Sequence, residues 1–125
     1  RGTPVLAVAD GRVTRVAHGS AYGRQIDILH RDGNATVTSR YFHLDSQQVR
    51  EGQQVLRGQP IGTLGHSGLL AGQLNHLHFS ILSDGRLQDP NLFWINGIGR
   101  VTCFAPDQSV TTERFKASYP VQCAR

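Results

Sequence analysis

Glycine-containing turns divide this sequence into short apolar segments, and none of these is long enough for an extended helix. The dipeptides Asp10-Gly11, Asp32-Gly33 and Asp84-Gly85 stand between runs rich in valine, isoleucine, leucine and threonine. Glycine supplies the positive φ angles that tight turns require, and β-branched residues favour strands. The pattern predicts a mostly β protein built from hairpins.

The composition agrees with this fold class and excludes others. The 125 residues include 14 glycines, two glutamates, one lysine and no methionine, so residues that favour helices are scarce. The hydrophobic fraction of 38% suffices for a packed core. No apolar run approaches the roughly 18 residues that a membrane span needs. We therefore expect one small folded domain rather than a membrane protein or a disordered chain.

Alternating apolar and polar residues predict the individual elements of the first half. We expect one hairpin within residues 5–16 and a second formed by residues 25–30 and 35–43. Another turn is expected at residues 44–46. A Gly-Gln pair recurs after six residues, and its glycines, Gly52 and Gly58, predict two tight corners.

The second half contains fewer signals. Residues 62–73 hold four glycines and predict a loop, which is followed by a strand over residues 74–82 and a turn at Asp84-Gly85. Asp89-Pro90 suits the start of a short helix. The last part of the chain predicts a separate hairpin or lobe, so we divide the sequence into a core of residues 1–98 and a lobe of residues 99–125.

Histidines are the candidate functional residues. His76 and His78 stand two apart in the strand expected over residues 74–82, so their side chains leave the same face. Zinc accepts neutral imidazole nitrogens in a tetrahedral array, so this pair can start a zinc site, or one histidine can bind metal while the other transfers protons. A solvated strand face would explain the same pair without any function.

A third histidine, His43, ends a neighbouring strand, two residues after Tyr41. Tyr41 and His43 are therefore expected to share a face. A hydrolytic metal site needs a metal-bound water, a base and donors for the developing oxyanion, and this set of residues favours such a site. The other histidines, His18, His30 and His66, are expected to be structural.

Eight short motifs follow one another in an order and spacing that resemble the lysostaphin-like, LytM-type peptidoglycan endopeptidases, over about residues 1 to 90. They are Gly2-Thr3-Pro4-Val5, Ala9-Asp10-Gly11-x-Val13, Tyr22-Gly23, His30-x-Asp32-Gly33, Tyr41-x-His43-Leu44, Val49-x-x-Gly52-Gln53-x-Val55-x-x-Gly58-Gln59-x-Ile61-Gly62, Gly65-x-Ser67-Gly68 and His76-Leu77-His78-Phe79.

The resemblance implies a small antiparallel β-sheet groove and a zinc-activated water that hydrolyses peptide bonds in the stem peptides or cross-bridges of peptidoglycan. Position by position, it implies that His78 is a zinc ligand and that His76 and His43 are catalytic. Tyr41 is a possible additional donor to the transition state.

Two further zinc ligands of that family, a histidine and an aspartate, lie just before its Gly-Thr-Pro-Val motif. This sequence opens at Arg1 with that motif, without an initiator methionine or a signal peptide. Neither Asp10 nor Asp27 matches a ligand position. We therefore expect a segment of a longer protein, in which the parent binds one zinc ion and the 125 residues alone are inactive.

Two alternatives come from other functional classes. Some members of the family have lost zinc ligands and activate amidases, so a binding module without catalysis is the first alternative. Retention of His43, His76 and His78 favours an enzyme. The Gly-Gln repeat also resembles biotinyl and lipoyl carrier domains, but such carriers need a lysine at a hairpin tip, and Lys116 is far from any such turn.

The two cysteines, Cys103 and Cys123, have no metal-binding spacing. They can form a disulfide that closes a loop of about 20 residues, which implies an extracytoplasmic location: periplasm, cell envelope or outside the cell. Two unpaired cysteines in a cytosolic protein are the alternative. The disulfide-bearing lobe is also similar to the C-terminal extension of secreted staphylolytic relatives.

The net charge of +4 is spread along the chain. No basic tract follows a helix or an aromatic row, so nucleic acid is not the expected partner. A diffuse positive field would instead steer an anionic partner such as a carboxylate-rich cell-wall polymer, or simply serve solubility. The expected partner is a peptidoglycan peptide.

Overall fold

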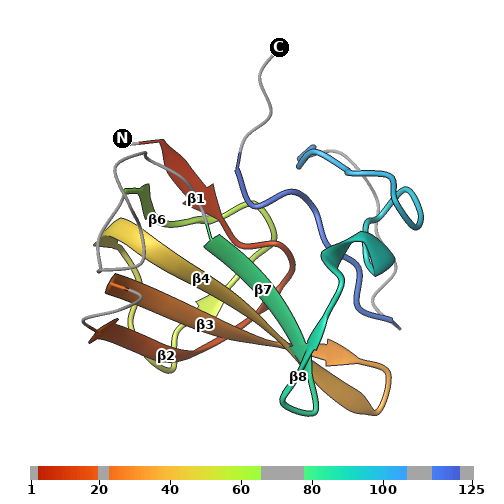
Figure 1. Cartoon of the computed structure of the whole chain (residues 1–125), viewed down its shortest axis with the longest axis horizontal. Coiled ribbons are helices and arrows are strands. Elements are labelled where there is room, and N and C mark those ends of the chain that lie inside the picture. The colour runs from red at the N-terminus through yellow and green to blue at the C-terminus, as the bar shows by residue number, and fades with distance from the viewer. Residues whose placement is uncertain (1–2, 20–22, 66–77, 107–113, 122–125) are drawn as a thin grey trace.

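The computed structural model describes residues 3–19, 23–65, 78–106 and 114–121. Within them, antiparallel strands form one sheet in the order β1-β6-β4-β3-β2-β5, and β7 pairs with β4 and β8 (Figure 1). The elements are β1 (Pro4–Leu6), β2 (Gly11–Gly19), β3 (Gly23–Asp32), β4 (Ala35–Gln47), β5 (Gln54–Val55), β6 (Pro60–Leu64), β7 (His78–Ser83), β8 (Arg86–Gln88) and the 3-10 helix η1 (Pro90–Leu92). The expected mostly β, antiparallel fold is confirmed.

The hairpin expected from residues 25–30 and 35–43 is confirmed as β3–β4, and it lies at the centre of the sheet. Gly33 has a φ of 62° in its turn, where glycine is the least strained residue. Along β4, Val37, Ser39 and Tyr41 are buried, whereas Thr38 and Arg40 are half-buried. This alternation is the expected one, because successive side chains of a strand leave opposite faces.

The expected hairpin within residues 5–16 is wrong. β1 pairs with β6, whereas β2 pairs with β3 and β5. Gly11 is not among the residues with positive φ. A Cβ at Gly11 would instead clash with the carbonyl oxygen of Leu29, so this glycine permits the close approach of two strands. Asp10-Gly11 resembles a turn signal but serves strand packing.

The turn expected at residues 44–46 is also wrong, because β4 continues to Gln47. The corners at Gly52 and Gly58 are confirmed, with φ values of 89° and 80°. They reverse the chain around β5 and lead it into β6. The short helix after Asp89 is confirmed as η1, and the side chain of Asp89 caps it by accepting the Asn91 N–H.

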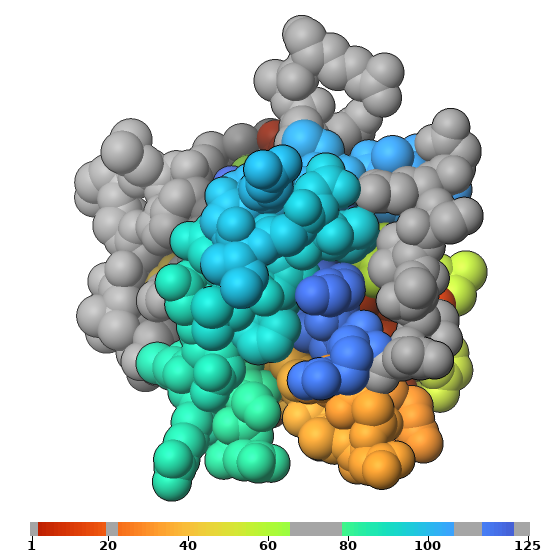
Figure 2. Space-filling model, turned by 90° about the vertical axis from the view of Figure 1, so that its right-hand side faces the viewer, coloured from red at the N-terminus to blue at the C-terminus, as the bar shows by residue number. Residues whose placement is uncertain are grey.

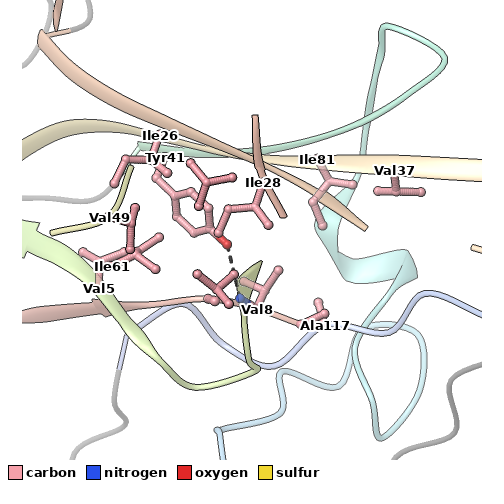
Figure 3. Close-up of a cluster of buried hydrophobic side chains, with 14 of the residues drawn as sticks. Val5, Val8, Ile26, Ile28, Val37, Tyr41, Val49, Ile61, Ile81 and Ala117 are labelled. Carbon is pink, nitrogen blue, oxygen red and sulfur yellow. Dashed lines mark hydrogen bonds between the residues drawn. The ribbon is translucent and has the colours of Figure 1, made fainter. Parts of the chain in front are cut away.

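The hydrophobic core lies between the sheet and the segment that follows β1 (Figure 3). Ile26, Ile28 and Tyr41 from the sheet pack with Val8 and Ile61, and all five are fully buried. The Tyr41 hydroxyl accepts the Val8 N–H at 3.2 Å, which satisfies a backbone donor inside the core. The core thus contains a tyrosine whose polar end has a structural partner.

Residues 114–121 pack on this same core. Phe115 and Ala117 belong to the buried cluster, and the Ser118 N–H donates to the Val8 carbonyl at 2.9 Å. Figure 2 shows this segment, in blue, against the orange β3–β4 hairpin. The division at residue 98 stays a prediction. So does the disulfide, because Cys123 lies outside the described residues. In the described part, no helix has the length and hydrophobicity that a membrane crossing demands.

Candidate functional site

The candidate site lies where β4 changes its partner. Residues 37–42 of β4 pair with β7, whereas residues 44–47 pair with β6. On the other side of β4, Tyr41 opposes Ile26 and Leu44 opposes Arg24. Phe42 and His43 therefore stand opposite the single residue Gln25, which is the geometry of a β-bulge. His43 occupies the junction between the two neighbouring strands.

His43 has an unusual backbone conformation. Its φ is 60°, and its side chain is 1% exposed. The other described residue of this kind outside glycine, Asp84, belongs to a hairpin turn in which positive φ is ordinary. Positive φ within a strand is uncommon for histidine, and such conformations gather at functional sites. The bulge thus redirects the chain at a candidate catalytic residue.

His78 begins β7, and its Cα lies opposite that of Phe42. The backbone of one predicted site residue is therefore adjacent to the bulge that carries another, His43. His76 lies outside the described residues, as do His66 and the first part of the strand expected over residues 74–82. The roles of His43, His76 and His78 stay predictions.

Tyr41 points into the core, where its hydroxyl contacts the Val8 N–H and the Ser39 hydroxyl, the latter at 2.9 Å. Burial raises the pKa of Tyr41 to about 12. We expected Tyr41 and His43 to share a face because residues two apart do so in a regular strand. The bulge makes β4 irregular at this point, so that rule does not apply. The hydroxyl thus satisfies polar groups inside the core. Its role as a transition-state donor stays a prediction.

His30 is a second buried histidine, away from the bulge. Its Nδ1 lies 2.9 Å from the Asp10 carbonyl oxygen, and its Nε2 lies 2.7 Å from Ser39 Oγ. Burial lowers the pKa of His30 to about 4, so the ring is neutral at pH 7. Sequence reasoning expected a structural role for His30 but did not find the chain of hydrogen bonds that continues through Ser39 to Tyr41.

The two acidic residues that the sequence excluded as ligands have other partners. Asp27 forms a two-pronged ion pair with Arg40, with N–O distances of 3.0 and 3.1 Å, and accepts a hydrogen bond from Gln25. The Asp10 carboxylate accepts the Arg57 N–H at 2.8 Å. Each carboxylate therefore stabilises the fold by a local contact.

The zinc site expected from the sequence needs three protein ligands. Within the part of the chain that the structure describes, no group of three histidine, cysteine, aspartate or glutamate side chains is close enough to hold a metal ion. These residues alone do not fit a complete zinc site, so we derive no catalytic step through zinc.

Comparisons with known proteins place this arrangement in context. The chain is 36% identical over 89 residues to the peptidoglycan DD-endopeptidase ShyC of Vibrio cholerae, a match that covers 71% of this chain and 19% of ShyC. It is 37% identical over 91 residues to the murein hydrolase activator NlpD of Escherichia coli, covering 72% of this chain and 22% of NlpD. The chain spans about a fifth of the length of these curated relatives.

The fold has a counterpart among solved structures. The crystal structure of a zinc-containing peptidase from Vibrio cholerae superposes with a TM-score of 0.63 at 39% identity, over 70% of this chain and 26% of that one. Residues 1–90 match the sequence model of peptidase family M23. Sequence motifs, sheet and comparisons agree, and the chain belongs to peptidase family M23.

Proposed function

We propose that the protein to which this chain belongs is a zinc-dependent endopeptidase of the cell envelope that hydrolyses peptide bonds in peptidoglycan stem peptides or cross-bridges. The observation that carries the proposal is the bulge at Phe42 and His43 opposite the start of β7. Phe42, the neighbour of His43 in the bulge, lies opposite His78. The motifs predict that His43 and His78 act together.

The roles follow the chemistry of each group. His78 is the proposed ligand in this chain, and a histidine and an aspartate before Arg1 are the other two proposed ligands. A zinc ion held by these three residues would supply Lewis-acid chemistry to the hydrolysis. His43 and His76 would accept and return the proton or donate to the developing oxyanion. The contacts of Tyr41 inside the core favour a positioning role, in which it supports the strand that carries His43.

The test uses the full-length protein and compares single substitutions. We expect His78→Ala to reduce bound zinc to background, and His76→Ala to retain zinc but lose peptidoglycan turnover. The matched control is His18→Ala, because His18 is exposed on β2; this variant should keep both zinc and turnover. Zinc measured in purified His78→Ala at the wild-type level would contradict the assigned ligand.

A second candidate function is supported by the similarity to the murein hydrolase activator NlpD. Such a protein would bind and activate a separate amidase without hydrolysing a bond itself. Full-length protein that has no zinc and no turnover, but that raises the rate of an added amidase, would support this candidate. The 125 residues alone are expected to bind zinc weakly and to lack turnover under either function.

A further inference from the structure

A second potential binding site lies at the opposite end of the β3–β4 hairpin from His43. A pocket of about 540 Å³ opens between β2, β3 and residues 114–116. Thr36 lines it, and His43 lies seven residues farther along β4, which corresponds to roughly 20 Å of strand. Figure 2 shows the two walls side by side: the orange hairpin and the blue C-terminal segment. The pocket is therefore separate from the proposed active site.

Positive charge dominates the lining. It includes five cationic residues and a single acidic one, Asp10. Two of the cations already have partners. Arg57 donates to the carbonyl oxygens of Val8 and Lys116, and Arg114 forms an ion pair with Asp32 at 2.7 Å.

The other three cations are Arg12, Arg31 and Lys116. Among the described residues, none of their side chains forms an ion pair, and Arg12 and Arg31 are exposed. Like charges that line a concave wall focus their field into the cavity and raise the local concentration of ions of opposite sign. The pocket is therefore suited to an anion.

The framework of the pocket is held in place by hydrogen bonds. Asp32 accepts the Phe115 N–H at 3.0 Å, and Arg57 bonds the Lys116 carbonyl oxygen at 3.0 Å from the other side. The Phe115 ring packs against His30 in a tilted arrangement, with ring centroids 4.9 Å apart. A cavity whose walls are already fixed loses little entropy when a ligand binds.

The uncharged part of the lining indicates which anion fits. Leu29 is half-buried and contributes apolar surface beside the cations, whereas Ala9 and Phe115 line the pocket but are almost fully buried. An inorganic phosphate is strongly hydrated and would leave this surface uncovered. A carboxylate on a short aliphatic chain can pair with Arg12 or Lys116 and place its methylene groups against Leu29.

We propose that this pocket binds a carboxylate carried on an aliphatic chain, such as a free carboxyl group of a peptidoglycan peptide, away from the site of hydrolysis. The identification of the ligand as a cell-wall peptide rests on the proposed function, but the preference for a carboxylate does not. Such a site would hold the protein on its polymer while His43 and His78 act elsewhere on it.

The test measures binding of small probes to the full-length protein by NMR titration of its backbone amides. The probes are N-acetylglutamate, its neutral analogue N-acetylglutamine methyl ester, and inorganic phosphate. We expect N-acetylglutamate to bind saturably and to shift the amides of Gly11, Arg31 and Lys116. The neutral analogue should cause no saturable shift, and phosphate should bind more weakly than N-acetylglutamate.

Two double variants distinguish binding at this pocket from non-specific attraction to the positive charge of the protein. Arg12→Gln combined with Lys116→Gln should weaken N-acetylglutamate binding at least tenfold. The control combines Arg86→Gln with Arg15→Gln, which removes the same amount of charge from exposed positions outside the pocket. It should change the affinity for N-acetylglutamate less than twofold. Equal weakening in both double variants, tighter phosphate binding, or no saturable binding would overturn the proposal. None of these results would bear on zinc uptake or hydrolysis, which the His78 and His76 variants test separately.

Discussion

Two buried histidines of the same sheet, His30 and His43, differ in backbone conformation and in the strand pairing around them. They are 2% and 1% exposed. His30 lies on a regular strand, and both of its ring nitrogens have hydrogen-bonding neighbours in the core. His43 lies in a bulge, with a φ of 60°, where β4 exchanges β7 for β6. Burial alone therefore does not distinguish these two histidines, whereas the backbone conformation and the change of strand partner at His43 do.

The largest expected difference between these histidines concerns catalysis. In full-length protein, His43→Ala should lower peptidoglycan turnover roughly 10²- to 10⁴-fold, because a positioned acid or base contributes that much. Bound zinc should stay at the wild-type level. The measurement is kcat on purified peptidoglycan, together with zinc content. Turnover within threefold of wild type would remove His43 from the proposed mechanism.

The next difference is in the pH dependence of stability. The pKa of folded His30 is lowered to about 4, so between about pH 6.5 and pH 4 the unfolded state binds the extra proton. The free energy of unfolding should therefore hold above about pH 6.5 and fall by about 3 kcal/mol as the pH drops toward 4.

Urea unfolding of wild type and His30→Gln across this pH range measures the His30 contribution by difference. Glutamine does not titrate, so the variant should lose less stability on acidification than wild type. Parallel curves for the two proteins would show that His30 is not the responsible group, and that other histidines or carboxylates carry the acid sensitivity.

The third prediction concerns the hydrogen-bonded chain that His30 begins. Tyr41→Phe removes the hydroxyl that satisfies the Val8 N–H, so the free energy of unfolding should fall by about 2 kcal/mol. Tyr119→Phe is the matched control, because Tyr119 is 39% exposed; its effect should stay within about 0.5 kcal/mol. Chemical denaturation of both variants makes the comparison. Equal effects would mean that the buried bond contributes nothing.

The smallest expected effect concerns the backbone of His43. Asparagine tolerates positive φ better than β-branched residues do. Relative to the Asn variant, the Val variant should therefore be about 1 kcal/mol less stable at position 43 than at position 30, which is equally buried and accounts for the difference in polarity. At position 30, which has a regular strand conformation, the same pair should not show this backbone penalty. If the difference between the Val and Asn variants were the same at positions 43 and 30, the bulge would not impose strain in solution.

Much of the fold was predictable because its signals are local. Gly33, Gly52 and Gly58 adopt the positive φ that their turn contexts indicate, and Asp89-Pro90 begins η1. The errors concern pairing. Asp10-Gly11 has the composition of a hairpin turn, but Gly11 serves the close approach of β2 to β3. Nothing in the dipeptide separates these two uses of glycine.

The candidate site shows the same limit. Motif spacing was sufficient to nominate His43, His76 and His78, because the order of short motifs is a property of the chain. The bulge could not be foreseen, since Tyr41-Phe42-His43-Leu44 is compatible with a regular strand. The extra residue in β4 is visible only from the pairing with β3, in which Tyr41 lies opposite Ile26 and Leu44 lies opposite Arg24. The basic pocket was also missed, because its residues are far apart in sequence.

By itself, the sequence determined the class of secondary structure, the main turns and which histidines are proposed to act in hydrolysis, because propensity, φ preference and side-chain type belong to each residue and its neighbours. Only the tertiary structure decided which strand pairs with which, that His43 stands in a bulge, and that residues 114–116 close a cationic pocket against β2 and β3. These features depend on contacts between distant segments, and several pairings of short strands satisfy the same local preferences.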